Sequence, residues 1–335
     1  MAGNVLKGFE DMRVISSILL LAISGWAATV SPKRPIQLMV SQIEDPTKVA
    51  VVGPGATGSH VVRAQILLDR ATYSPGQIDG QYGDDLGVAI KGYQEAHNLK
   101  PSGTIDTEMW ALLNADVHPL LVTYTITALD VKGPFEAIPK DVQEQAKMKW
   151  LGYESAEEGL GEKFHLSPKL LAELNPGLDL KSAGVEITVP DVRRSAGGRA
   201  VRVVVSKSKR TVTAYGVGGR ILAQYPATIG GEHDPLPIGH WTITSVSRDP
   251  WFFYNPEHFW YANPATATAK VAPGPRNPVG VVWMGLSKEH YGIHGTPDPG
   301  HVRHGESAGC IRLTNWDASA LASMVRRGTP AMLEE

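Results

Sequence analysis

Hydrophobic residues recur with two different periods along this chain, and the period changes at residues 195–199, a glycine-containing stretch that we expect to be a short hinge. Before that point, apolar residues stand at helical spacing in residues 61–70 and again, at i, i+3, i+4 and i+7, in Leu86, Ala89, Ile90 and Tyr93. After it, β-branched or alternating runs predict strands at residues 201–205, 211–215, 220–228 and 241–246. The pattern therefore predicts a multidomain chain with a small all-α domain first and a mainly β domain last.

Capping residues add a helix to each of these domains. Asp106 or Thr107 can begin a third, short helix of the N-terminal domain. Thr314 or Asn315 can begin a helix near the C-terminus, and Gly328 is expected to end it. This last helix would flank the β domain, which we expect to be a sandwich or a barrel.

The first residues have the pattern of an export signal. Arg13 precedes an apolar run at residues 14–23, and small residues follow at Ala27 and Ala28. We expect a signal peptide over residues 1–28, a linker over residues 29–58, and a mature protein without a stable membrane span, because the run is short. A buried core helix is the alternative. Met12 is a second possible start of translation.

Composition limits the classes of function. A chain of 335 residues predicts more than one domain, and its net charge of −2 with no basic stripe gives no reason to expect a nucleic-acid partner. Its one cysteine excludes an intramolecular disulfide. An unpaired thiol in an oxidising compartment is prone to oxidation, so its presence suggests that it has a use.

That cysteine, Cys310, follows the tight-turn sequence Ser307-Ala308-Gly309, and His294 stands sixteen residues before it. A cysteine and a histidine can act as nucleophile and general base in acyl transfer, with the amides of Gly309 and Cys310 as donors to an oxyanion. The alternative is a buried, inert thiol. The glycine before Cys310 favours the catalytic interpretation, because such a turn aims a side chain and two amides at one point.

The sequence H-G-T at His294, followed by S-A-G-C-I-R-L at Ser307, resembles the signature of the L,D-transpeptidases of the YkuD family. Residues 235–243 and 274–280 are similar to further segments of that family. The resemblance implies a catalytic domain over residues 200–334, with Cys310 as nucleophile and His294 as base. It also implies that the carbonyl of Gly295 accepts the second imidazole N–H. Ala308 replaces a histidine that is frequent in the family.

The N-terminal domains also resemble known modules. Residues 59–116 resemble a three-helix peptidoglycan-binding domain, with D-G-Q-Y-G at Asp79 and G-T-I-D at Gly103. Residues 170–177 and 184–190 resemble the second half of a LysM module, whose first strand would be residues 122–128. We expect an α+β LysM-like domain over residues 120–192. Whether it binds glycan stays open, because an extra stretch at residues 132–153 departs from the compact form.

Three more residues are candidates for binding substrate. Arg312 can hold a substrate carboxylate through its bidentate fork, although a structural ion pair is equally compatible with its position. Ser307 is a further candidate, and His304 is expected at the rim of the cleft together with His301. The histidines at residues 290, 294, 301 and 304 raise the possibility of a metal site, but the loop lacks a helix to align them, so we expect no metal and no cofactor.

The resemblance implies an exported enzyme of the periplasm or cell wall that acts on peptidoglycan stem peptides and glycan. Cys310 would form a thioester with a tetrapeptide stem and pass the acyl group to an amine of another stem or of a protein. The same thiol chemistry could serve an L,D-carboxypeptidase or hydrolase, and a non-catalytic wall-binding protein is a further alternative. If the enzyme is active, we expect the pair of Cys310 and His294 to hold more thiolate than a free cysteine does.

Overall fold

The computed structural model describes residues 38–48, 50–194, 198–260 and 262–335. The predicted signal peptide lies outside the described residues, as does most of the predicted hinge at residues 195–199. Within the described ranges, no helix combines the length and the hydrophobicity that crossing a membrane would require.

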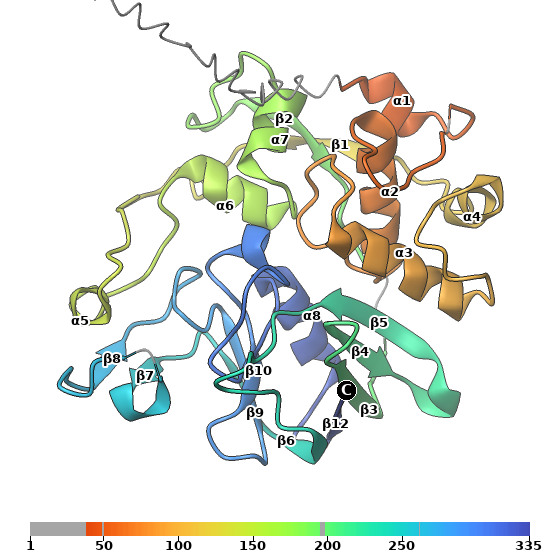
Figure 1. The fold of residues 1–335 in the computed structure, drawn as a ribbon. Coiled ribbons are helices and arrows are strands. Elements are labelled where there is room, and N and C mark those ends of the chain that lie inside the picture. The colour runs from red at the N-terminus through yellow and green to blue at the C-terminus, as the bar shows by residue number, and fades with distance from the viewer. Residues whose placement is uncertain (1–37, 49, 195–197, 261) are drawn as a thin grey trace, which may run out of the picture. The chain divides into compact units, whose positions relative to one another are not determined.

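The first described domain is helical, and its helices can be followed in Figure 1. They are α1 (Val40–Glu44), α2 (Ser59–Arg70), α3 (Asp84–Ala96) and α4 (Thr107–Leu113). The apolar face predicted for α3 is buried in Leu86, Ala89, Ile90 and Tyr93. Asp106 caps α4, since its Oδ1 accepts a hydrogen bond from the amide of Met109 at 3.0 Å. The predicted helical domain is therefore present with its predicted cap.

The stretch predicted as a linker, residues 29–58, is packed in the part that the structure describes. It contains α1, whose Ile43 has no exposed surface, and Val52 is buried with it. The indole Nε1 of Trp110 donates to the carbonyl of Ala50 at 2.8 Å. The linker prediction is wrong for these residues, because isolated apolar side chains such as Ile43 carry no periodicity that sequence alone could detect.

The middle segment forms a strand, a set of short helices and a second strand. These elements are β1 (Leu121–Thr125), α5 (Val142–Gln145), α6 (Ala156–Lys163), α7 (Pro168–Leu174) and β2 (Glu186–Pro190). β1 and β2 pair in antiparallel fashion, with Leu121 opposite Pro190. α5 lies in the stretch at residues 132–153 that departs from the LysM pattern.

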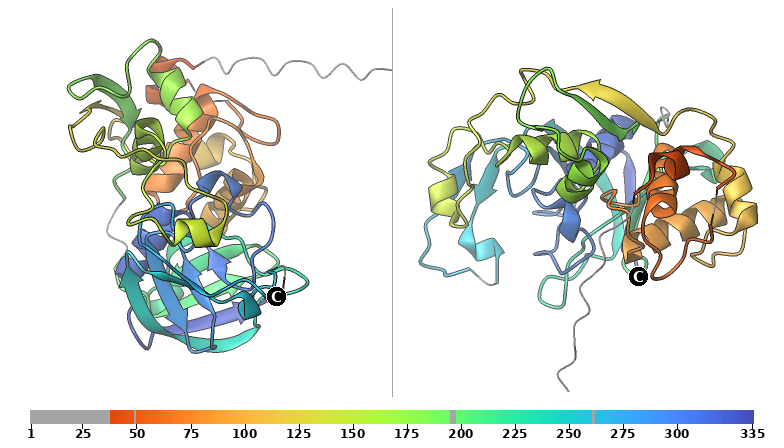
Figure 2. Two further views of the ribbon diagram at one scale, coloured as in Figure 1. Left: turned by 90° about the vertical axis from the view of Figure 1, so that its left-hand side faces the viewer. Right: turned by 90° about the horizontal axis from the view of Figure 1, so that it is seen from above.

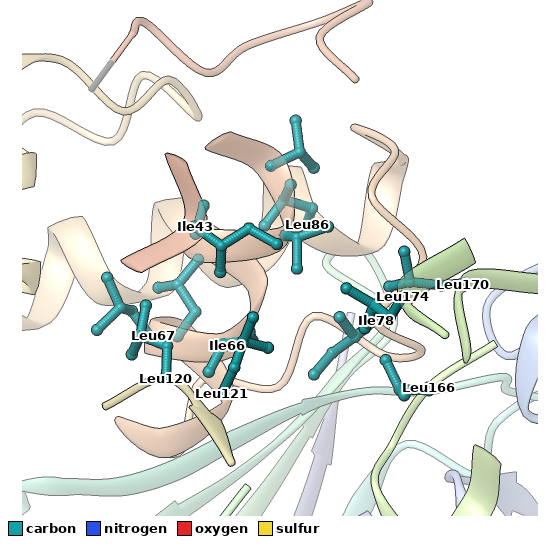
Figure 3. Close-up of a cluster of buried hydrophobic side chains, with 14 of the residues drawn as sticks. Ile43, Ile66, Leu67, Ile78, Leu86, Leu120, Leu121, Leu166, Leu170 and Leu174 are labelled. Atoms are coloured by element: carbon teal, nitrogen blue, oxygen red, sulfur yellow. The ribbon is translucent and has the colours of Figure 1, made fainter. Parts of the chain in front are cut away.

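This segment shares one hydrophobic core with the helical domain. Figure 3 shows Ile78 from the loop before α3 beside Leu166, Leu170 and Leu174. The extra stretch packs elsewhere: Leu151 clusters with Val271, and its amide donates to the carbonyl of Pro273 at 2.9 Å. The N-terminal segments that sequence separates into modules therefore do not have separate cores.

The C-terminal domain is built on an eight-stranded sheet in the order β11-β10-β9-β6-β12-β3-β4-β5. Its strands are β3 (Arg202–Ser206), β4 (Thr211–Tyr215), β5 (Ile221–Pro226), β6 (Gly239–Arg248), β9 (Val282–Leu286), β10 (Gly292–His294), β11 (Ile311–Arg312) and β12 (Pro330–Glu334). A separate pair is formed by β7 (Phe252–Tyr254) and β8 (Ala269–Val271). Single 3₁₀ turns are η1 (Val217–Gly219), η2 (Pro256–His258) and η3 (Pro299–His301).

The large sheet curls so that its two edges meet at one end, and the curvature is visible in Figure 2. Thr228, just after edge strand β5, exchanges backbone hydrogen bonds of 2.9 and 2.8 Å with Arg312 of the opposite edge strand β11. The domain is thus mainly β, as predicted, and is built on one large curled sheet beside the β7–β8 pair. This contact also brings the chain after β5 to the residues that follow Cys310.

The predicted C-terminal helix is α8 (Asn315–Met324), and Thr314 caps it by accepting from the amide of Asp317 at 3.2 Å. The helix ends at Met324, with Val325 as its C-cap, and not at the predicted Gly328. Gly328 has φ of 87° and donates its amide to Ile243, so its left-handed conformation turns the chain into β12.

Candidate active site

β10 and β11 place the two candidate catalytic side chains on one face of the sheet. These strands are parallel neighbours, with Ile293 opposite Ile311 and His294 opposite Arg312. Because successive side chains of a strand alternate between faces, Cys310 and Arg312 share a face, and His294 shares it with them. Residues sixteen apart in sequence are therefore brought to neighbouring strands, with Cys310 directly before β11 and two positions along the register from His294.

The turn before Cys310 requires a glycine. Gly309 has φ of 88°, and a Cβ built there would lie 2.7 Å from a ring carbon of Tyr291. The hydroxyl of Ser307 closes the turn by donating to the carbonyl of Cys310 at 2.5 Å. Within the described residues, the amides of Gly309 and Cys310 have no hydrogen-bond acceptor. Both amides therefore remain for an oxyanion.

The imidazole of His294 is held in one tautomer. Its Nδ1 lies 2.6 Å from the carbonyl oxygen of Gly295, as the family resemblance implies. A carbonyl only accepts hydrogen bonds, so Nδ1 carries the proton and Nε2 keeps its lone pair. The ring stacks on Trp283, with centroids 5.5 Å apart.

This imidazole is neutral at neutral pH. Burial and the nearby Arg312 guanidinium lower the pKa of His294 to about 3, although the bond to Gly295 acts in the opposite direction. The side chain is 3 % exposed, so little solvent stabilises a charged ring. His294 is therefore available as a proton acceptor over the whole neutral range.

The thiol of Cys310 is neutral as well. Burial raises the pKa of Cys310, and Asp234 adds to the rise, while the Gly292 amide and Arg312 act against it. Sγ donates to the carbonyl of His290 at 3.6 Å, and no hydrogen bond among the described residues joins it to His294. The raised pKa of Cys310 thus runs against the expectation of an enriched thiolate, and both groups are neutral at neutral pH.

Alkylation of Cys310 by iodoacetamide should accordingly be slow near neutral pH and accelerate as the pH rises past the ordinary thiol value of about 8.5. The raised pKa leaves less thiolate at neutral pH than a free cysteine has. The rate can be followed by intact mass spectrometry against N-acetylcysteine. Fast alkylation at about pH 7 that slows in His294→Ala would instead show a thiolate–imidazolium pair.

A pocket of about 280 Å³ opens beside this turn. Its lining includes Gly231, His233, Asp234, Trp260, Glu306, Ser307, Ala308 and Arg312. Within the described residues Arg312 forms no salt bridge, and its buried Nε has no hydrogen-bond partner. The alternative of a structural ion pair at Arg312 therefore has no support, and a guanidinium with free donors borders the site.

Of the other two predicted binding residues, one lines the pocket and one does not. Ser307 lines the pocket, but its hydroxyl is engaged with Cys310. His304 is exposed and does not line the pocket. His301 is also exposed and lies 2.8 Å from the Asp298 carboxylate. Across the described ranges, no three His, Cys, Asp or Glu side chains gather as metal ligands would.

Sequence reasoning missed much of the pocket wall. His233 and Asp234 lie in the loop between β5 and β6, and Trp260 lies between β7 and β8. The rings of His233 and Trp260 stack, with centroids 4.1 Å apart. Such loops have no hydrophobic period, and the only sequence signal was their position beside the motif at residues 235–243.

Comparison with known families places two domains in the chain. Residues 200–333 match the L,D-transpeptidase catalytic domain, YkuD. Residues 57–113 match a peptidoglycan binding domain.

Curated relatives extend this similarity. The chain is 33 % identical over 174 residues to a protein named L,D-transpeptidase YkuD of Bacillus licheniformis, covering 51 % of this chain and 89 % of the relative. It is 30 % identical over 167 residues to its namesake in Bacillus subtilis, covering 50 % and 85 %.

Solved structures give weaker similarities. An L,D-transpeptidase from Mycobacterium smegmatis aligns at 21 % identity and a TM-score of 0.32, covering 46 % of this chain and 65 % of that one. An L,D-transpeptidase from Xylanimonas cellulosilytica aligns at 15 % identity and a TM-score of 0.36, covering 84 % and 96 %.

Proposed function

The chain belongs to the YkuD family of L,D-transpeptidases, and we propose that it is an exported enzyme that acylates Cys310 with peptidoglycan stem peptides. The acyl group then passes to an amine, which cross-links two stems or attaches a protein. The observation that carries this proposal is the His294 imidazole, locked with Nδ1 on the Gly295 carbonyl and on the same sheet face as Cys310.

Acylation begins with a neutral pair. The thiol turns from the His290 carbonyl toward Nε2 of His294, which takes its proton as Sγ attacks the carbonyl carbon of the third stem residue. The oxygen that becomes negative accepts hydrogen bonds from the amides of Gly309 and Cys310. When the C–N bond to the fourth residue breaks, His294 returns the proton to the departing amine, and a thioester remains.

The second half of the reaction repeats these roles in reverse. An acceptor amine attacks the thioester carbonyl and gives its proton to His294, and the Cys310 sulfur leaves and recovers a proton. Arg312 holds a carboxylate of the donor stem, because its guanidinium has free donors at the pocket wall. Water in place of the amine would give a hydrolase by the same route.

Peptidoglycan is the polymer on which both identified domains act, and this implies a cell-wall location. In our proposal, the N-terminal domain keeps the enzyme on this immobile polymer and raises the local concentration of stems. The middle segment, in which three short helices lie between two paired strands, would be a LysM-like module that adds glycan contacts.

Incubation of purified protein with isolated sacculi should remove tetrapeptide stems and produce dimers linked between third residues, as measured by chromatography and mass spectrometry of muropeptides. Cys310→Ala is the matched control. Accumulation of tripeptides without new dimers would identify a hydrolase. Muropeptides unchanged from the control would contradict any peptidase or transpeptidase activity.

A further inference from the structure

The loop at residues 296–307 connects His294 to the turn of Cys310, so its position affects the pocket. The catalytic domain holds it at several points. The amide of Arg303 donates to Oγ1 of Thr228 at 2.8 Å, and the amide of Ser307 donates to the carbonyl of Ile229 at 3.0 Å. Thr228 is also the residue whose backbone pairs with Arg312. A shift of Arg303 would therefore be transmitted to the wall of the pocket.

A further anchor comes from the peptidoglycan-binding domain. Nη1 of Arg303 donates to Oδ1 of Asp85, in the first turn of α3, at 3.3 Å. The side chains of Arg303 and Asp85 are only 12 % and 18 % exposed, so solvent screens this pair weakly. Within the described residues, Asp85 is the only carboxylate within ion-pair distance of Arg303.

The anchored residue has an unusual backbone. Arg303 has φ of 65°, a left-handed conformation that costs a non-glycine residue free energy. Asp85 is also confined, since a Cβ on Gly76, whose φ is 72°, would lie 3.1 Å from Oδ2 of Asp85. The Asp85 carboxylate thus packs against Gly76 of its own domain through one oxygen and contacts Arg303 of the loop through the other.

We propose that Asp85 is a positioning residue for acyl transfer: through Arg303 it fixes the loop between His294 and Cys310, so the peptidoglycan-binding domain shapes the active site in addition to tethering the enzyme. The inference rests on the proposed function, because the site positioned is the one in which Cys310 is acylated.

The charge of Asp85 does not stabilise the fold. Burial raises the pKa of Asp85 to about 6, and the nearby charge of Asp84 adds to this rise. Arg303 and His304 act in the opposite direction and lower the pKa. An acid whose pKa is higher in the folded state stabilises that state when protonated, and this contribution is lost as the pH rises through the folded value. At neutral pH a neutral side chain of the same shape should therefore cost no stability. The observed role of this carboxylate is therefore its contact with Arg303.

The test compares Asp85→Asn with Asp84→Asn in the full-length protein. Asp84 is exposed, lies on the same helical turn and forms no ion pair among the described residues, so it controls for the loss of one charge. On a soluble stem peptide, which needs no tether, Asp85→Asn should lower kcat/KM by roughly 2- to 30-fold. Asp84→Asn should match the wild type. The Tm of Asp85→Asn should be unchanged or higher.

Two further measurements separate positioning from a structural role. The ratio of wild-type to Asp85→Asn activity should be large at about pH 7.5 and approach unity at about pH 5, where Asp85 is protonated. Arg303→Gln should lower kcat/KM similarly, and the double variant should be no worse than either single one, because each change breaks the same contact.

Wild-type kcat/KM in Asp85→Asn at neutral pH would overturn the inference and leave the proposed function intact. A loss of activity explained by a lowered Tm, or independent of pH, would assign Asp85 a structural role and also overturn it. A wild-type protein without turnover on the peptide would overturn the proposed function and this inference together.

Discussion

Replacing Cys310 by alanine or serine is expected to lower transpeptidation by on the order of 10⁴- to 10⁶-fold, as loss of a covalent nucleophile does elsewhere. Serine keeps the shape of the side chain, but its hydroxyl is a much weaker nucleophile beside a single neutral imidazole. The thiol is half-buried, and its hydrogen bond to His290 is long at 3.6 Å, so we expect both variants to fold normally.

The measurement is acylation by a carbapenem, whose strained ring offers an acyl group to the same nucleophile. Intact-mass spectrometry of the wild type should show one added drug mass, and peptide mapping should place it on the peptide containing Cys310. His294→Ala should slow this acylation while leaving alkylation of the thiol at high pH unchanged, because only proton transfer is lost. An adduct on a serine, or on the Cys310→Ala variant, would contradict the assignment.

The local geometry of the candidate catalytic residues was predictable because the motif is local in sequence and its turn depends on residue type. Cys310 needs a turn, and Gly309 supplies the conformation that the turn requires. His294 needs an acceptor for one nitrogen, and the backbone of Gly295, next to it in sequence, provides it. The spacing of apolar residues predicted α3 and the main strands for the same reason, since that signal also lies within a few adjacent residues.

The protonation state of the site was not predictable, because it depends on the surroundings of each group. The pKa of His294 falls through burial and Arg312, and that of Cys310 rises chiefly through burial. Neither degree of burial can be read from the motif. Contacts between distant segments, such as Asp85 with Arg303, are likewise absent from any local pattern.

The shared cores of the N-terminal segments were missed for a related reason. Sequence divides the chain at its glycine-containing stretches, and it places a hinge at residues 195–199. Arg194, directly before that hinge, is instead 11 % exposed and lies between two carboxylates. One belongs to Asp69 of α2 and the other to Asp317 of α8, at 2.5 and 2.8 Å.

This network links several segments. Neither Asp69 nor Asp317 has exposed surface. Asp317 also accepts from the hydroxyl of Ser74 at 2.7 Å, and Asp69 lies 3.0 Å from Nδ1 of His165. Burial alone would raise the pKa of Asp69, but Arg194 and His165 hold it below its ordinary value.

Arg194→Met should therefore be among the most destabilising single substitutions, at about 3–5 kcal/mol, since it leaves two buried carboxylates without their cation. The sign of the pH dependence follows from the same charges. In the wild type, the depressed pKa of Asp69 gives stability that is lost as the pH falls, whereas burial raises the pKa of Asp317, whose contribution is instead lost as the pH rises. In the variant, the two buried carboxylates lack the guanidinium, which raises their pKa. Acid therefore removes the cost of burying their charges, and the two proteins should converge in Tm toward about pH 5.

The neighbouring residue provides the matched control. Arg193 pairs with Asp191 through a side chain that is 85 % exposed, so Arg193→Met should cost at most about 1 kcal/mol and show no such convergence. Thermal unfolding of both variants over a range of pH distinguishes them. Equal losses in the two variants would mean that the buried charges at Asp69 and Asp317 are stabilised without Arg194. In that case, Arg194 would not be what stabilises the link between Asp69 of α2 and Asp317 of α8.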